Sequence, residues 1–90
     1  MSMDEQYAQM RRFKDELVNF NERLRASMQD LKGQHEAVNP YWRDEMRHTY
    51  DTHWEPLDEQ MRNYLEREGP AYVDFLNNKI RALGAYLYGR

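Results

Sequence analysis

Apolar residues recur at seven-residue steps through the first third of the chain. Tyr7 and Met28 add to this seam between its regular positions, whereas Lys14, Asn21 and His35 fill other interleaved positions with polar groups. The seam consists of Met3, Met10, Leu17, Leu24, Leu31 and Val38. A seven-residue repeat keeps apolar side chains on one side of a helix, so the pattern predicts a long amphipathic helix with polar interruptions.

The ends of this helix follow from two local signals. Ser2-x-x-Glu5 has the spacing of a capping box, in which the two side chains satisfy backbone N–H groups at a helix start. Gly33 is the first residue that can end the helix at little energetic cost, because glycine adopts a left-handed conformation readily. These signals predict a helix over residues 3–32, with a helix that continues through Gly33 as the alternative. Phe13 and Phe20 lie beside the seam and widen it, which indicates contact with two neighbours.

A second apolar stripe begins after Asn39-Pro40, a pair typical of helix starts. Pro56 lies inside this stripe, but the stripe keeps its register across the proline, which favours a continuous helix kinked there. Glu68-Gly69-Pro70 predicts its end, so the second helix is expected over residues 40–68. The stripe consists of Trp42, Met46, Tyr50, Trp54, Leu57, Met61, Tyr64 and Leu65.

A third, shorter helix is predicted over residues 70–88. Its apolar side carries Val73, Leu76, Ile80, Leu83 and Leu87. Residues 1–90 are therefore expected to form a single all-α domain, an antiparallel hairpin of two long helices followed by the third helix, and to dimerise. The third helix either folds back into a three-helix bundle or docks on another chain.

Composition narrows the classes of partner. The 16 acidic and 13 basic residues are mixed along the chain, with no basic face for nucleic acid. Every apolar run is too short for a membrane span or a signal peptide, so we expect a cytoplasmic protein, or one exported by a leaderless route. The absence of cysteine excludes disulfides and thiolate metal sites.

Few residues suggest catalysis or metal binding. Glu45-x-x-His48 has the spacing of one half of a di-iron site in a helical bundle, but the required second pair is missing. His53 falls in the apolar stripe beside Trp54, where a packed histidine is expected more often than a catalytic one. We therefore predict no enzyme activity, no metal and no cofactor.

The segment that starts at Trp42-Arg43-Asp44 resembles the WXG family of small helical hairpins exported by type VII-like secretion systems. In that family a Trp-x-Gly motif marks the turn between two helices, and apolar positions follow along the second helix. Tyr50, Trp54 and further apolar residues resemble these positions, and Asp44 stands where the family has glycine. The resemblance covers about residues 3–68, and the third segment departs from the flexible tail of many members.

The resemblance implies a protein-protein interaction module that acts as a secretion- or toxin-associated adaptor. Its partner would be itself or a related hairpin protein, in a homo- or hetero-oligomer. Trp42, Asp44, Tyr50 and Trp54 would form the motif region, and Phe13 and Phe20 would offer additional apolar surface. The alternative is a cytoplasmic structural or regulatory scaffold, or a chaperone-like helical oligomer.

Overall fold

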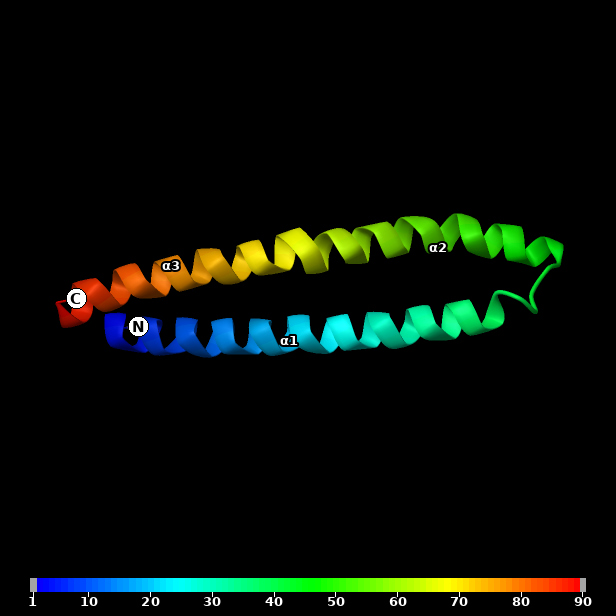
Figure 1. Cartoon of the computed structure of the whole chain (residues 1–90). Coiled ribbons are helices and arrows are strands. Elements are labelled where there is room, and N and C mark those ends of the chain that lie inside the picture. Colours follow the sequence, from blue (N-terminus) through cyan, green and yellow to red (C-terminus); the bar gives the residue numbers. More distant parts are fainter. Residues whose placement is uncertain (1, 90) are drawn as a thin grey trace.

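The computed structural model describes residues 2–89 and shows an all-α hairpin (Figure 1). One arm is helix α1, Met3–Val38. The other arm runs without a break through α2 (Glu45–Asn63), a π-helical turn η1 (Tyr64–Glu68) and α3 (Gly69–Tyr88). The two arms are antiparallel, so both chain termini lie at the end opposite the turn. The predicted hairpin of two long helices is confirmed.

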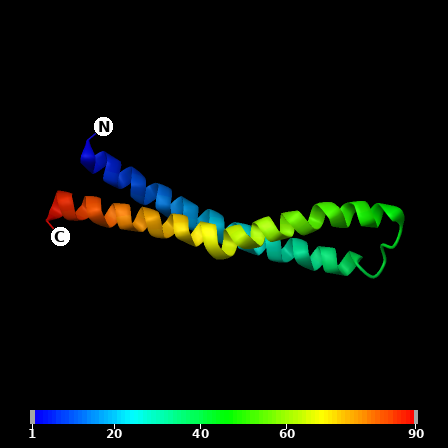
Figure 2. The same cartoon turned by 90° about the horizontal axis from the view of Figure 1, so that it is seen from above.

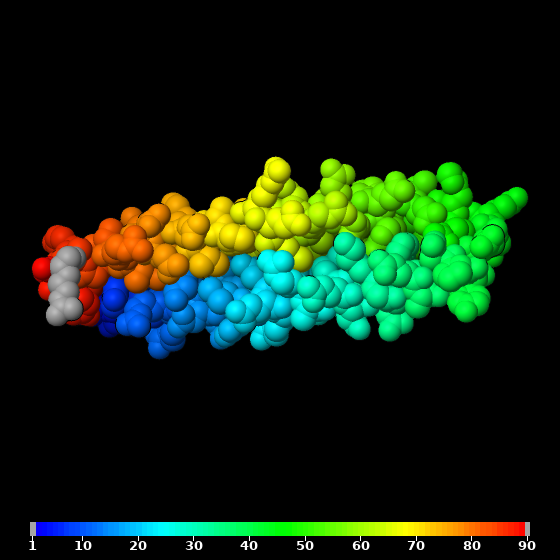
Figure 3. Space-filling view, viewed as in Figure 1, coloured from blue at the N-terminus to red at the C-terminus, as the bar shows by residue number. Residues whose placement is uncertain are grey.

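The hairpin is a thin rod with a sparse core. It measures 64 × 21 × 17 Å, and its radius of gyration is 19.6 Å, whereas a compact domain of this length would have about 12 Å. Only Met28 and Leu65 are buried among its large apolar side chains in residues 2–89, each 8% exposed. Both line one hollow between the arms. Figure 2 shows that the arms cross near the middle of the rod. The space-filling view in Figure 3 shows the same narrow shape.

The first helix begins where the sequence predicts and ends later. The Ser2 hydroxyl accepts a hydrogen bond from the Glu5 backbone N–H at 3.1 Å, which confirms the N-cap. The expected end at Gly33 is wrong, because α1 continues to Val38. A glycine inside a helix costs only about 1 kcal/mol relative to alanine. The extra turn carries His35 into contact with α2, which offsets that cost.

The second helix starts five residues later than predicted, after a turn over residues 39–44. Asn39 keeps right-handed helical angles and donates its N–H to the His35 carbonyl, so it caps the end of α1 rather than the start of α2. Pro40 follows as prolines often do after a helix end. The N-cap of α2 is Asp44, whose carboxylate accepts the Arg47 N–H at 3.3 Å.

Pro56 lies inside α2, which continues through it, so the continuous helix expected there is confirmed. The kink expected at Pro56 stays a prediction.

The expected stop at Glu68-Gly69-Pro70 is wrong, because the helix continues there into α3, whose range is close to the predicted residues 70–88. The chain widens into the π-helical turn η1, in which the Gly69 N–H reaches back five residues to the Tyr64 carbonyl. In the same register Pro70 would donate to the Leu65 carbonyl, but proline has no N–H. Arg25 of α1 supplies the missing donor, with its Nη2 3.1 Å from the Leu65 carbonyl oxygen. The helix therefore passes Pro70, and α3 packs along the N-terminal half of α1 within the same chain.

The effects of substitutions at Arg25 and Pro70 on stability are therefore expected to be coupled. R25M leaves the half-buried Leu65 carbonyl without its donor and is expected to lower the free energy of unfolding by about 1–2 kcal/mol. In a P70A background, residue 70 again has a backbone N–H that can donate in the turn. R25M should then lower the free energy of unfolding by less. Urea unfolding of the four chains of this double-mutant cycle measures the coupling. R23M, an exposed arginine on the same helix, is the control, and an equal loss in both backgrounds would contradict the account.

Candidate functional site

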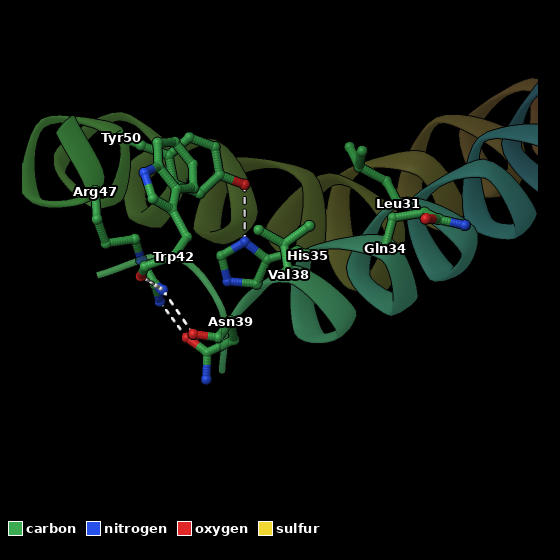
Figure 4. A pocket seen from close by; sticks show the side chains of 8 residues that line it. All are labelled: Leu31, Gln34, His35, Val38, Asn39, Trp42, Arg47 and Tyr50. Atoms are coloured by element: carbon green, nitrogen blue, oxygen red, sulfur yellow. Dashed lines mark hydrogen bonds between the residues drawn. The ribbon is translucent and has the colours of Figure 1, made fainter. Parts of the chain in front are cut away.

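Four ring side chains gather at the turn end of the hairpin (Figure 4 shows three of them). His35 of α1 stacks on Trp54 of α2, with ring centroids 4.3 Å apart and planes 8° from parallel. The His35 Nδ1 lies 2.8 Å from the Tyr50 hydroxyl. Trp42, in the turn, contacts Tyr50 with centroids 5.0 Å apart. The cluster joins both arms and the turn, and all four side chains are half-buried.

The motif residues Trp42, Asp44, Tyr50 and Trp54 therefore come together, but the histidine among them was missed. His53 was expected in the apolar stripe and is instead exposed. His35 of α1, and not His53, packs against Trp54. The signal for it was present in the sequence, because His35 occupies an interleaved position of the first seam and so faces the second helix.

Asp44 links the turn to the start of α2. Its backbone has φ −87° and ψ −177°, an extended conformation open to any residue. Its carboxylate accepts hydrogen bonds from the Trp42 indole N–H at 2.8 Å and from the Arg47 N–H. Asp44 thus caps α2 and fixes the orientation of Trp42.

Arg47 ties the turn to both helices, a role that the sequence pattern did not indicate. Its guanidinium donates to the backbone carbonyls of Asn39 and Trp42 at 3.1 and 3.0 Å, and to the Asn39 side chain. Its Nε also pairs with the Asp51 carboxylate at 2.9 Å. One side chain therefore satisfies carbonyls at the end of α1 and in the turn, which positions Trp42 over the cluster.

A shallow hollow of about 190 Å³ lies beside the cluster, and Figure 4 shows its lining. It is smaller than the roughly 300–1,000 Å³ of typical small-molecule sites. Its lining is Leu31, Gln34, His35, Val38, Asn39, Trp42, Arg47 and Tyr50. Within residues 2–89 no three histidine, aspartate or glutamate side chains are grouped as metal ligands would be. The hollow suits one apolar side chain of a partner better than a substrate.

Phe13 and Phe20 lie away from the cluster, on the open half of the hairpin. Phe13 is 58% exposed and Phe20 is 47% exposed, so much of each ring is accessible to a partner. A second hollow, of about 310 Å³, lies beside Phe13 and is lined also by side chains of the other arm. Leu17 of α1 lines it too, and the side chains of the other arm are Tyr64, Tyr72, Phe75 and Leu76.

The two hollows belong to one long surface, which we call the apolar face. On α1 its exposed members are separated by 7, 11 and 7 residues, steps that return to the same side of a helix. On the second arm, Tyr72 and Phe75 share a hollow with Phe13, and helical spacing assigns Met46, Leu57 and Tyr86 to the same side of that arm. The apolar face consists of Phe13, Phe20, Leu31 and Val38 on α1, and Met46, Leu57, Tyr72, Phe75 and Tyr86 on the second arm.

Few charged side chains lie on the apolar face, and one of them, Arg47, lines the hollow at the turn. The α1 positions that share its stripe include Gln6, Gln9, Leu24 and Ser27, and none of them is ionisable. Lys79 shares the stripe on α3, where its long stem lets the ammonium group reach solvent. On the opposite side the arms are joined by polar contacts such as the Lys32–Asp58 ion pair at 3.4 Å. The hairpin therefore has one polar side and one apolar side.

At the open end the two termini meet through Tyr7 and Tyr88. Their rings pack edge to face with centroids 5.6 Å apart, and Gly84 of α3 lies against the Tyr7 ring. Partial burial raises the pKa of the Tyr88 phenol, and the Asp4 carboxylate 3.4 Å away raises it further. This contact keeps α3 on α1 up to Gly89, whose left-handed φ of 73° ends the helix.

None of the helices within residues 2–89 is both long and apolar enough to cross a membrane. Comparison of the chain with protein-family models, with curated proteins and with solved structures found no match in any of the three searches. The turn cluster and the apolar face are the two features of the hairpin that could bind a partner.

Proposed function

We propose that this chain is a non-enzymatic protein-protein interaction module that binds another helical surface through its apolar face. The observation that carries the proposal is that large, half-exposed apolar side chains follow one side of both arms, from Phe13 and Tyr86 near the open end to Val38 and Met46 at the turn. Contiguous apolar surface of this size marks a binding site in soluble proteins.

The amount of exposed surface supports a partner. The accessible area is 7213 Å². A compact protein of 11.1 kDa would expose about 5,700 Å². The difference of roughly 1,500 Å² exceeds the ~800 Å² that each partner contributes to a standard interface. A partner that covers the apolar face would therefore give the hairpin the burial that its own thin core lacks.

The shape of the face indicates what kind of partner fits. Its two rows follow helical spacing, one on each arm, so a helix or a second hairpin can place side chains between them. Polar Gln and Ser side chains interrupt the α1 row without adding charge, which suits a helical partner with few charges on the facing side. A flat or strongly charged partner would match this surface poorly.

The resemblance to WXG-type hairpins gives the proposal a biological setting, that of a secretion- or toxin-associated adaptor. Two features support it: Trp42 lies at the inter-helix turn, and Asp44 takes the glycine position without backbone strain. A gene for a type VII ATPase, or for a large toxin with a similar N-terminal domain, beside the gene for this chain would support this setting.

A cytoplasmic structural or regulatory scaffold is the second candidate. The observation that favours it is that α3 is packed against α1 as far as Tyr88, whereas many WXG-type members carry a flexible tail after the hairpin. The absence of such neighbouring genes would favour the scaffold.

Substitution of Phe20 tests the interaction function. F20D places a charge in the apolar face, where its burial against a partner is costly, and is expected to weaken association by about 10- to 100-fold, or roughly 1.4–2.8 kcal/mol. N19D is the matched control, because Asn19 is exposed one position along the same helix but lies off the face. Both variants should melt within a few degrees of the unchanged chain at low concentration.

Sedimentation measures association of the full chain by itself and with the proteins encoded by adjacent genes. The proposal fails if the chain is a monomer in every one of these mixtures. It also fails if N19D weakens assembly as much as F20D does, because association would then not depend on the apolar face.

A further inference from the structure

We infer that the hairpin opens in its turn half alone: α2 swings away from α1 about the π-helical turn η1, while α3 stays packed on α1. The contact that keeps α2 closed is the stack of His35 on Trp54, together with the hydrogen bond between His35 and the Tyr50 hydroxyl. We call this contact the latch. The motion belongs to one chain and does not depend on a partner. It follows from a difference between the two halves of the hairpin in how closely the helices approach.

In the half of the hairpin that holds the chain termini, α3 lies close to α1 along much of its length. Two glycines of α3 allow this approach. A Cβ atom at Gly84 would lie 3.2 Å from the Tyr7 ring, and one at Gly69 would lie 3.1 Å from the Asn21 Nδ2. Helices that pack this closely gain contacts between many backbone and side-chain atoms. Separating α3 from α1 is therefore costly.

In the turn half the backbones of α1 and α2 hardly come close to each other, and Figure 1 shows the wider spacing of the ribbons there. None of the residues of α2, Glu45–Asn63, is buried. The contacts of α2 with α1 come from the ends of long side chains, namely the latch and the Lys32–Asp58 ion pair at 3.4 Å. A partly exposed ion pair contributes little to stability, so the latch provides most of the attachment.

The π-helical turn η1, between α2 and α3, is the point about which α2 can bend. The Leu65 carbonyl in this turn accepts a hydrogen bond from Arg25 of α1 at 3.1 Å. Helices bend where their ladder of backbone hydrogen bonds is interrupted in this way. The same turn is anchored on α1, because Leu65 is buried and the Tyr64 hydroxyl donates to the Asn21 side chain at 2.7 Å. A bend at η1 therefore moves α2 and leaves α3 in place.

The connection at the other end of α2 gives the helix room to move. Residues 39–44 link α1 to α2 outside any helix and would span about 20 Å when extended. The hydrogen bonds from Arg47 to Asn39 are exposed, so water can replace them in the opened state at little cost. Opening would expose the side of α2 that carries Tyr50, Trp54 and Met61, which the closed hairpin partly covers.

Distances between paired spin labels, measured by pulsed EPR, test this motion, since the chain contains no cysteine of its own. A37C/T52C places labels on α1 and α2 in the turn half, and A8C/A82C places them on α1 and α3 in the other half. All four positions are exposed. Labelled chain is mixed with an excess of unlabelled chain, so that only distances within one chain are measured.

W54A removes the latch and is expected to raise the ratio of opened to closed chains about 10- to 100-fold. The A37C/T52C pair should then show a second, longer distance, whereas the A8C/A82C pair should keep a single one. H35A removes the latch from the side of α1 and should have the same effect. Circular dichroism should give both variants the helix content of the unchanged chain, because α2 moves as an intact helix.

Y88A is the matched control at the other end of the hairpin. It also removes a ring that joins the two arms, since Tyr88 packs edge to face on Tyr7 with centroids 5.6 Å apart. The close approach of α3 to α1 remains in this variant. Both label pairs should therefore keep single distances in Y88A.

Four results would overturn the inference. A single distance for A37C/T52C in both W54A and H35A would mean that the latch does not hold α2 closed. A second distance for A8C/A82C in W54A would mean that the hairpin opens as a whole. A second distance for that pair in Y88A would mean that the two halves are held alike. A loss of helix content in both W54A and H35A would mean that the chain unwinds where a swing of α2 is expected.

Discussion

Replacing Gly69 with leucine is expected to lower the free energy of unfolding by about 2–3 kcal/mol, because the crossing of the two arms has no room for a side chain there. A Cβ atom at this position would lie 3.1 Å from the Asn21 Nδ2 and 3.1 Å from the Tyr64 carbonyl oxygen. The carbonyl belongs to the π-helical turn and accepts the Gly69 N–H, so it cannot withdraw without breaking that bond.

G33L is the matched control for G69L. Gly33 is also inside a helix, but a Cβ atom there would meet nothing within 4 Å. The same substitution should therefore leave stability unchanged or raise it by up to about 1 kcal/mol through better helix propensity. Urea unfolding followed by circular dichroism, at one protein concentration for all chains, compares the two. Equal stability of G69L and G33L would show that the arms do not approach closely at Gly69.

Replacing Trp54 with alanine is expected to cost about 2–3 kcal/mol, since it removes the largest side chain that joins the arms at the turn end. The indole stacks on His35 of α1 and lies 6.1 Å from Tyr50, centroid to centroid. Because the ring is half-buried, the loss should fall below that of a fully buried tryptophan. W54F keeps an aromatic surface for His35 and should retain much of the stability.

W42A provides the comparison within the cluster. Trp42 stands in the turn and is held mainly by Tyr50 and Asp44, so its removal should cost about 1–2 kcal/mol, less than W54A. Thermal unfolding at a fixed concentration gives the order of the two losses. A loss below 1 kcal/mol for W54A, or a larger loss for W42A, would contradict the role assigned to the His35–Trp54 stack.

The tests separate three properties of the hairpin. Gly69 and Trp54 report how one chain holds its two arms together, at the crossing and at the turn. Phe20 reports whether the apolar face binds a partner. If the variants at Gly69 and Trp54 behave as expected and the variant at Phe20 does not, the fold would be supported and the proposed function would be wrong.

The sequence by itself determined the class of fold and the side of each helix that faces its neighbour. Seven-residue spacing, the Ser2 cap and the unbroken register across Pro56 are local features of the sequence. The structure has the long first helix, its N-cap and the helix that continues through Pro56 at the predicted positions. Trp42, Tyr50 and Trp54 were expected to lie together for the same reason, since residues four and eight positions apart share a helix face.

Only the tertiary structure decided where the helices end. Gly33, Asn39-Pro40 and Gly69-Pro70 are strong local signals for a break or a start, yet the first and last lie inside continuous arms. Their local cost is about 1–3 kcal/mol, and contacts from the other arm offset it: His35 on Trp54 beyond Gly33, and Arg25 on the Leu65 carbonyl before Pro70. Such contacts join residues tens of positions apart, so no local pattern contains them.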